Sequence, residues 1–166
     1  MPYFKLPYWK FSGSLIIIVA LVFGPISQTT RVTARHAGGF SCFLIAALLI
    51  LSAFKAIFYE FVTDNNKRSK AQKFFPYCHQ CLGWTLFILI GYHSLFFLNL
   101  FLWPAAKITV SLLITGILAT IGFILVMVSG LDINKVLERK LFRSAYSRHL
   151  FTIVLLAFLI VLHINI

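Results

Sequence analysis

The 166-residue chain is 60% hydrophobic and 11% charged, whereas an ordinary soluble domain is about 45–50% apolar and about 25% charged, so the composition indicates a membrane protein. Fifteen Lys and Arg against four Asp and Glu give a formal charge of +11, but the apolar runs leave no soluble domain to carry a basic nucleic-acid-binding face, and we expect no nucleic-acid partner. The three cysteines do not form the disulfide framework of a small secreted protein.

Five apolar segments are expected to cross the membrane, because a span needs about 20 mostly apolar residues for a hydrocarbon core of about 30 Å. They cover residues 11–28, 39–59, 80–103, 108–130 and 149–166. The strongly apolar part of the first segment is short and follows two lysines, as in a signal peptide. No small-x-small cleavage site follows it convincingly, and the aromatic residues before it are typical of an interfacial anchor, so we expect it to be retained as a span.

Turn-forming residues predict where the spans end. Residues 64–66 (Asp-Asn-Asn) are expected to break the chain after the second span, and Pro76 precedes the third. Residues 103–104 (Trp-Pro) are expected to cap the third span at the outer interface, and residues 130–132 (Gly-Leu-Asp) to end the fourth. A short basic amphipathic helix on the inner membrane surface is predicted for residues 133–147.

The distribution of Lys and Arg predicts the orientation of a five-span chain. Twelve of the fifteen fall on one side, and only Arg31, Arg35 and Lys107 fall on the other. Because cytoplasmic loops collect Lys and Arg, we expect a protein of the cell membrane with its N-terminus in the cytoplasm and its C-terminus outside. The basic inner surface suits an acidic electron donor and anionic membrane lipid equally well.

Five histidines are the most informative polar residues of the chain: His36, His79, His93, His149 and His163. His79 and His93 lie fourteen residues apart in the third predicted span, and the two C-terminal histidines lie fourteen residues apart in the fifth. Fourteen residues of α-helix turn through about 1400°, about 40° short of four full turns, and rise about 21 Å. Each of the two helices is therefore expected to present two imidazoles on one face, near opposite leaflets.

The third and fifth predicted spans run parallel, because a single span separates them. His79 is then expected at the depth of His149, and His93 at the depth of His163. Two imidazoles that face each other across a helix bundle can hold a haem iron from both sides. The sequence therefore predicts a single all-α domain over residues 1–166, a membrane bundle of five transmembrane helices with two b haems stacked between the third and fifth spans. Such a stack is a path for electrons across the membrane.

Other interpretations of these histidines are less consistent with the spacing. A lone intramembrane histidine most often forms a hydrogen bond between helices, but two separate pairs at one spacing on two spans arise by chance on the order of 1% of the time. Zinc needs its ligands at bonding distance from one ion, where two histidines fourteen residues apart on a helix cannot meet. Gly83 and Gly91, near the histidines of the third span, are expected either to let a porphyrin lie close to the backbone or to serve helix packing.

Further polar residues flank the histidines. Cys78 and Cys81 bracket His79, but the c-type haem attachment motif places its histidine after the second cysteine, and we expect these two cysteines to be bystanders. Four outer-side polar residues are expected near the depth of the outer haem, where a cation can pair with haem propionates: Arg31, Arg35, His36 and Lys107. The absence of outer acidic residues argues against a dedicated Fe³⁺ site, because hard cations prefer carboxylate oxygen.

Three segments resemble a known family. Residues 79–94 read His-Gln-Cys-Leu-Gly-Trp-Thr-Leu-Phe-Ile-Leu-Ile-Gly-Tyr-His-Ser, which resembles the His-x-x-Leu-Gly…His-Ser helix of the ferric-reductase-like transmembrane domain shared by ferric reductases and NADPH oxidases. Residues 34–38 (Ala-Arg-His-Ala-Gly) resemble that family's Ala-Arg-x-Ala-Gly start of the second helix. Residues 143–149 (Arg-Ser-Ala-Tyr-Ser-Arg-His), with His163 beyond them, are similar to its fifth helix. The resemblance covers most of the chain.

The resemblance implies a di-haem cytochrome b domain that takes electrons from a cytoplasmic flavin or nicotinamide donor to an acceptor outside. His79 and His149 would hold the inner haem, His93 and His163 the outer haem, and Arg35 would approach the acceptor edge of the outer haem. The family usually has a sixth helix, often followed by a flavin and nicotinamide domain. This chain ends three residues after His163, so we expect either that the reductase module is a separate cytoplasmic flavoprotein within a larger complex, or that the electron donor is a different redox partner subunit.

Two alternatives remain open. A di-haem cytochrome b fed by quinol has similar fourteen-residue histidine pairs and would carry a lipid-facing pocket beside one haem. A membrane scaffold subunit without redox activity would use its histidines only for packing and would be colourless.

Overall fold

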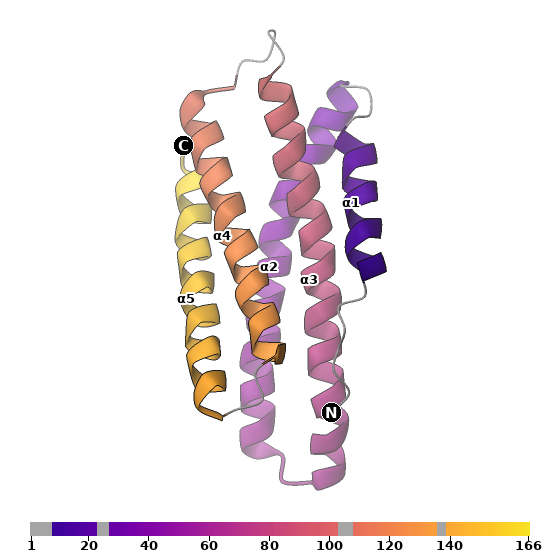
Figure 1. Cartoon of the computed structure of the whole chain (residues 1–166), viewed down its shortest axis with the longest axis vertical. Coiled ribbons are helices and arrows are strands. Elements are labelled where there is room, and N and C mark those ends of the chain that lie inside the picture. Colours follow the sequence, from indigo (N-terminus) through magenta and orange to yellow (C-terminus); the bar gives the residue numbers. More distant parts are fainter. Residues whose placement is uncertain (1–7, 23–26, 103–107, 136–138) are drawn as a thin grey trace. The chain divides into compact units, whose positions relative to one another are not determined.

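The computed structural model describes residues 8–22, 27–102, 108–135 and 139–166, and within them the side chains of residues 12–19, 27–102, 108–130 and 144–166. Apart from short turns and helix ends, these parts of the chain are helical and contain no strands, which confirms the predicted all-α fold class. Figure 1 shows the helices in chain order: α1 (Tyr8–Val22), α2 (Gln28–Phe61), α3 (Asn65–Phe101), α4 (Val110–Lys135) and α5 (Arg139–Ile164).

Four of the described helices are long and apolar enough to cross a membrane: α2, α3, residues 110–130 of α4 and residues 144–164 of α5. Helix α1 contains 15 residues, which at 1.5 Å per residue span about 22 Å, less than a hydrocarbon core of about 30 Å. The four long helices support the expected membrane protein. The first of the five predicted spans stays a prediction.

Helices α2 and α3 are longer than the spans predicted for them, with 34 and 37 residues. Helix α2 begins eleven residues early because Ser27 forms a capping box with Thr30, whose backbone N–H donates to the Ser27 hydroxyl at 3.1 Å and whose hydroxyl accepts from the Ser27 N–H at 2.9 Å. Helix α3 begins after Asp64, whose carboxylate accepts the N–H of Asn66 at 2.8 Å. Apolarity predicts the part of a helix inside the membrane, whereas these caps determine where the helix begins.

Pro76 lies inside α3 and does not precede the helix as predicted. Proline removes one backbone hydrogen bond and crowds the preceding turn, but packing of the neighbouring residues offsets that cost. Phe75 is 3% exposed, and its ring centroid lies 6.0 Å from that of Phe54 and 5.8 Å from that of Phe58, both on α2. The helix is therefore held against α2 where the proline weakens it.

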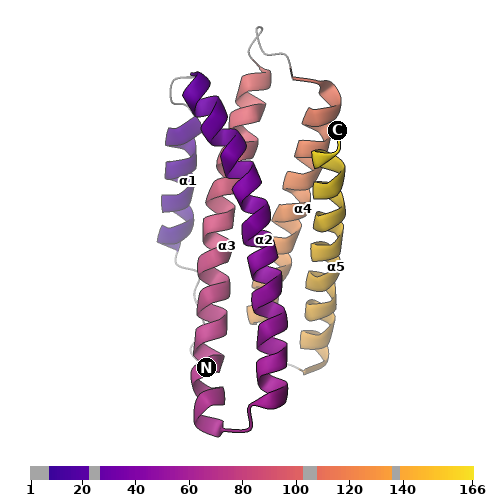
Figure 2. The same ribbon diagram turned by 180° about the vertical axis from the view of Figure 1, so that it is seen from behind.

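Helices α2 and α3 run antiparallel, joined by the short turn at residues 62–64, as Figure 2 shows. The guanidinium of Arg68 donates to the backbone carbonyls of Tyr59, at 2.8 Å, and Val62. The Val62 N–H donates to the carbonyl of Phe58 at 3.0 Å. These bonds satisfy carbonyl groups that the end of α2 leaves without helical partners.

Helices α4 and α5 form a second antiparallel pair, and their bounds correct two predictions. Helix α4 continues through Gly130 to Lys135, five residues past its predicted end. None of the described glycines has a positive φ, so Gly130 does not adopt the left-handed conformation that ends many helices. Within the predicted amphipathic helix at residues 133–147, the described residues belong to the two long helices: residues 133–135 end α4, and residues 139–147 begin α5. The predicted cap at residues 103–104 lies outside the described residues.

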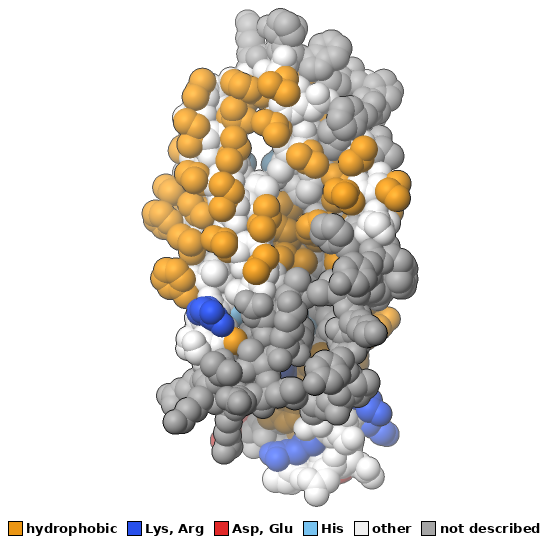
Figure 3. Space-filling view, viewed as in Figure 1, with side chains coloured by type: hydrophobic (Ala, Val, Ile, Leu, Met, Phe, Trp, Pro, Cys, Tyr) orange, Lys and Arg blue, Asp and Glu red, His pale blue; other side chains and the backbone are white. Residues whose placement is uncertain are grey.

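The chain divides into two compact units, Met1–Ile16 with Ser94–Ile166, and Ile17–His93. The prediction of a single domain stays a prediction. In both units large apolar side chains point outward, with Phe43 73% exposed on α2 and Phe151 68% exposed on α5. Figure 3 shows apolar side chains spread over α4 and α5. Such outer surfaces suit contact with membrane lipid.

Candidate histidine sites

The ring of His93 is held by α2. Its Nδ1 lies 2.8 Å from the backbone carbonyl oxygen of Ala34, which is completely buried. A carbonyl oxygen only accepts hydrogen bonds, so Nδ1 of the neutral ring carries the proton and the lone pair lies on Nε2. One helical turn further along α2, a Cβ at Gly38 would lie 2.5 Å from Nδ1 and Cε1 of His93. The absence of a side chain at Gly38 therefore makes room for this ring.

Two neighbours of His93 hold α3 at the same level. The hydroxyl of Tyr92 donates to the Thr30 carbonyl at 3.3 Å, and a Cβ at Gly91 would lie 2.7 Å from Cδ1 of Ile18. The space beside Gly91 is thus occupied by Ile18 of α1. Of the two roles predicted for Gly91, porphyrin approach and helix packing, this contact supports helix packing. A Cβ at Gly83 would meet none of the described atoms within 4 Å.

His149 is held by α4. Its Nδ1 lies 3.0 Å from the hydroxyl oxygen of Ser129, and a Cβ at the following residue, Gly130, would lie 3.1 Å from Cε1 of the ring. The Ser129 hydroxyl also lies 3.0 Å from the Val126 carbonyl and 2.9 Å from the Thr152 hydroxyl. His149 therefore joins a small hydrogen-bonded cluster at the contact of α4 with α5.

His163 is held by α4 in the same way. Its Nδ1 lies 3.1 Å from the hydroxyl oxygen of Thr115, and a Cβ at Gly116 would lie 3.2 Å from Cε1 of the ring. The Thr115 hydroxyl lies 3.1 Å from the carbonyl of Ser111 and 3.2 Å from that of Leu112. Three of the four predicted haem ligands thus share one pattern: Nδ1 contacts an oxygen of a neighbouring helix, and a glycine lies under the ring.

The remaining predicted site residues that the structure describes are exposed, except for Cys78, which is half-buried. His79 is exposed on α3. Arg35 and His36 are exposed on α2, next to the buried Ala34. Cys78 and Cys81 form no disulfide. The pairing of His79 with His149, that of His93 with His163 and the approach of Arg35 to a haem stay predictions.

No group of three or more His, Cys, Asp or Glu side chains that would hold a metal ion occurs among the described residues. A haem iron needs only two protein ligands, because the porphyrin supplies the other four. The histidines described above, each with its Nδ1 engaged, offer the kind of nitrogen that such an iron takes. Two haems held by these histidines stay a prediction.

Sequence reasoning missed the residues that contact the histidines. Thr115-Gly116 and Ser129-Gly130 are hydroxyl-glycine pairs fourteen residues apart, the same spacing as the histidines of the fifth predicted span. That repeat is visible in the sequence and indicates that the two pairs lie on one face of α4. The contact of His93 with Ala34 left no such signal, because a backbone carbonyl is present at every residue.

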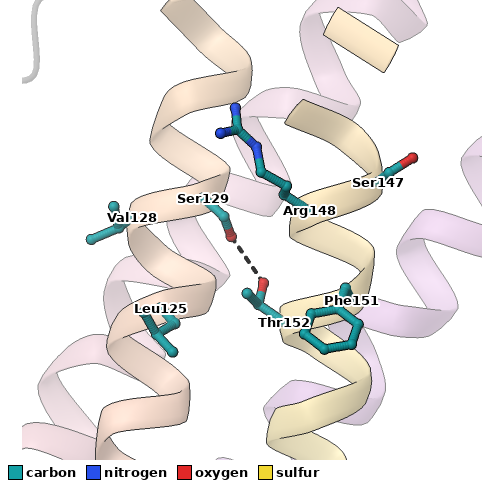
Figure 4. A pocket seen from close by; sticks show the side chains of 7 residues that line it. All are labelled: Leu125, Val128, Ser129, Ser147, Arg148, Phe151 and Thr152. Atoms are coloured by element: carbon teal, nitrogen blue, oxygen red, sulfur yellow. Dashed lines mark hydrogen bonds between the residues drawn. The ribbon is translucent and has the colours of Figure 1, made fainter. Parts of the chain in front are cut away.

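A shallow groove of about 410 Å³ lies beside His149, between α4 and α5. Figure 4 shows its lining, with the Ser129 hydroxyl bonded to that of Thr152 and the Arg148 guanidinium toward one end. The other lining residues are Leu125, Val128, Ser147 and Phe151. The groove is thus mostly apolar, with hydroxyl groups and one cation at its border. Ser129 lines it and also contacts the His149 ring.

No family model, curated protein or solved structure matches the chain. Membership of the ferric-reductase-like family therefore stays a prediction that rests on the three segments quoted above.

Proposed function

We propose that this chain is the haem subunit of a membrane oxidoreductase and carries electrons across the membrane through two b haems. His79 and His149 hold the haem nearer the cytoplasm, and His93 and His163 hold the haem nearer the outside. Each haem supplies one-electron chemistry, because its iron alternates between the ferric and ferrous states. The chain supplies the ligands, their orientation and an apolar surrounding.

The observation that carries this proposal is the shared hydrogen bonding of three histidines. A histidine that binds a metal almost always donates its other ring N–H to an oxygen acceptor, which fixes the ring and makes it a stronger ligand. Nδ1 of His93 has the Ala34 carbonyl at 2.8 Å, that of His149 has the Ser129 hydroxyl at 3.0 Å, and that of His163 has the Thr115 hydroxyl at 3.1 Å. Packing alone does not require the same ring nitrogen to be engaged three times.

The proposed direction of flow follows from the predicted topology. With five spans and a cytoplasmic N-terminus, most Lys and Arg residues face the cytoplasm and attract an acidic flavoprotein, the proposed electron donor. Arg35 then lies on the outer side, near the proposed acceptor edge of the outer haem. The donor and this chain are parts of one larger complex in the cell membrane.

Electron transfer across a vesicle membrane tests the proposal. Vesicles are loaded with ferricyanide, which does not cross the bilayer, and dithionite is added outside. We expect vesicles that contain the haem-loaded chain to consume the internal ferricyanide faster than protein-free vesicles. His93→Ala and His149→Ala should fall to the protein-free rate, while Ser52→Ala, at an exposed residue of α2 whose hydroxyl donates to the Leu48 carbonyl of the same helix, should keep the full rate. A wild-type rate equal to that of empty vesicles would reject the transmembrane path.

A second candidate keeps the haems but takes electrons from a membrane quinol, and the groove beside His149 favours it. Leu125, Val128 and Phe151 give the groove apolar walls, and Ser129 links it to the histidine. This candidate predicts that a quinol analogue reduces the haems without any flavoprotein, and that Val128→Trp slows this reaction without slowing reduction by dithionite. Reduction only in the presence of a flavoprotein would favour the first candidate.

A further inference from the structure

The α4 and α5 helices contain two copies of one arrangement. Helix α4 carries a hydroxyl residue followed by glycine at 115–116 and again at 129–130, and α5 carries histidine at 149 and 163. The helices are antiparallel, so the first hydroxyl residue meets the second histidine and the second hydroxyl residue meets the first. Equal spacing of fourteen residues on both helices keeps the two contacts in register.

The two copies agree in geometry as well as in sequence. The Nδ1 to hydroxyl distances are 3.0 Å for His149 and 3.1 Å for His163. The distances from Cε1 to a Cβ placed on the glycine are 3.1 Å at Gly130 and 3.2 Å at Gly116. Each ring therefore lies closely over a glycine, with the same nitrogen turned to a hydroxyl oxygen.

The hydroxyl protons decide which partner donates. Each hydroxyl has one proton, and groups other than the histidine ring accept it. The Thr152 hydroxyl donates to the His149 carbonyl at 2.8 Å, so the Ser129 proton goes to the Thr152 oxygen at 2.9 Å or to the Val126 carbonyl at 3.0 Å. The Thr115 proton goes to the Ser111 carbonyl at 3.1 Å. Both hydroxyl oxygens then accept from the histidine Nδ1–H. Each ring consequently has its proton on Nδ1 and its lone pair on Nε2, the nitrogen that would bind iron in the proposed function.

We infer that Ser129 and Thr115 are positioning residues that set the tautomer and ring orientation of His149 and His163, with Gly130 and Gly116 as the surfaces on which the rings lie. This inference rests on the proposed function. An Nδ1–H that donates to an oxygen makes the imidazole a stronger electron donor and stabilises ferric iron relative to ferrous iron. Each hydroxyl thus lowers the reduction potential of the haem that its histidine holds.

Separate redox titrations of the two haems test the inference. Ser129→Ala should raise the midpoint potential of the haem held by His149 and leave the other unchanged, and Thr115→Val should do the same for the haem held by His163. Loss of such a partner typically weakens metal binding by about 10- to 100-fold, so we expect a fall of that size in haem affinity at the affected site. The conservative variants Ser129→Thr and Thr115→Ser retain a hydroxyl and should restore both values.

Ser111→Ala is the matched control, because Ser111 is an exposed hydroxyl residue on α4 and its side chain contacts no histidine. Unchanged potentials and haem affinities in Ser129→Ala and Thr115→Val, with haem still bound, would overturn the inference and leave the proposed function standing. Equal shifts of both haems in each single variant would also overturn it, because they would indicate a general effect on helix packing. A wild-type chain that binds no haem would reject the proposed function and the inference together.

Discussion

The Nδ1 atom of His93 lies 2.8 Å from the carbonyl oxygen of Ala34, fifty-nine residues earlier in the chain. The contact joins α3 to α2 inside the part of the chain that comprises Ile17–His93. It determines the tautomer of the ring without the help of any side chain, and it depends on the missing side chain at Gly38. A substitution at this glycine therefore tests the site more sharply than one at Ala34.

Gly38→Ala should displace the His93 ring. The added Cβ would lie 2.5 Å from two ring atoms, closer than side chains approach in proteins. Overpacking of this kind costs about 1–3 kcal/mol. We expect a lower unfolding temperature and loss of about half of the bound haem, measured by thermal unfolding and absorption spectroscopy.

Gly39→Ala is the control for this substitution, because its Cβ would have no described atom within 4 Å. Its haem content should equal that of the wild type. Its unfolding temperature should be equal or slightly higher, because alanine favours helix more than glycine does. Equal behaviour of the Gly38 and Gly39 variants would mean that the ring does not lie where the structure has it.

Arg68→Ala should destabilise the turn between α2 and α3. The guanidinium is half-buried and donates to the carbonyls of Tyr59 and Val62, and hydrogen bonds to charged groups contribute about 1.5–3 kcal/mol, less where solvent screens them. We expect the free energy of unfolding to fall by about 1 kcal/mol, measured by thermal unfolding, with the haem content unchanged. Lys67→Ala removes an exposed neighbouring cation and should have no effect. The same loss in both variants would point to net charge as the cause.

Phe75→Ala should destabilise the contact of α2 with α3 strongly. Phe75 is 3% exposed and its ring lies near those of Phe54, Phe58 and Tyr59, and truncation of a buried phenylalanine costs about 3–5 kcal/mol. The adjacent Phe74 is 58% exposed, so Phe74→Ala should lower the free energy of unfolding far less than Phe75→Ala does. Thermal unfolding of the two variants in the same detergent compares them directly. A similar loss at both positions would contradict the buried ring cluster.

Hydropathy predicted the four long helices well, because about 20 consecutive apolar residues leave few other structures in a membrane. It predicted helix ends poorly. Ser27 and Asp64 extend α2 and α3 into polar sequence through side-chain caps. Pro76 and Gly130 were expected to mark boundaries but lie inside helices, because their neighbours pack against an adjacent helix and Gly130 keeps a helical backbone.

The histidine spacing indicated which residues share a face of a helix, but not what their rings contact. A period read from one helix contains no information about the helix beside it. The repeated hydroxyl-glycine pairs on α4 offered part of that information, since they have the same fourteen-residue spacing as His149 and His163. The Ala34 carbonyl offered none, because only the fold selects one backbone oxygen from all the others.

The count of haems per chain tests the account most directly. The purified chain is measured by reduced-minus-oxidised spectroscopy and as the pyridine haemochrome, together with His93→Ala, His149→Ala and the exposed control Ser52→Ala. We predict two b haems in the wild type and in Ser52→Ala, and about one in each of the two histidine variants. A colourless protein that is still folded would contradict electron transfer through this chain and would favour a membrane scaffold.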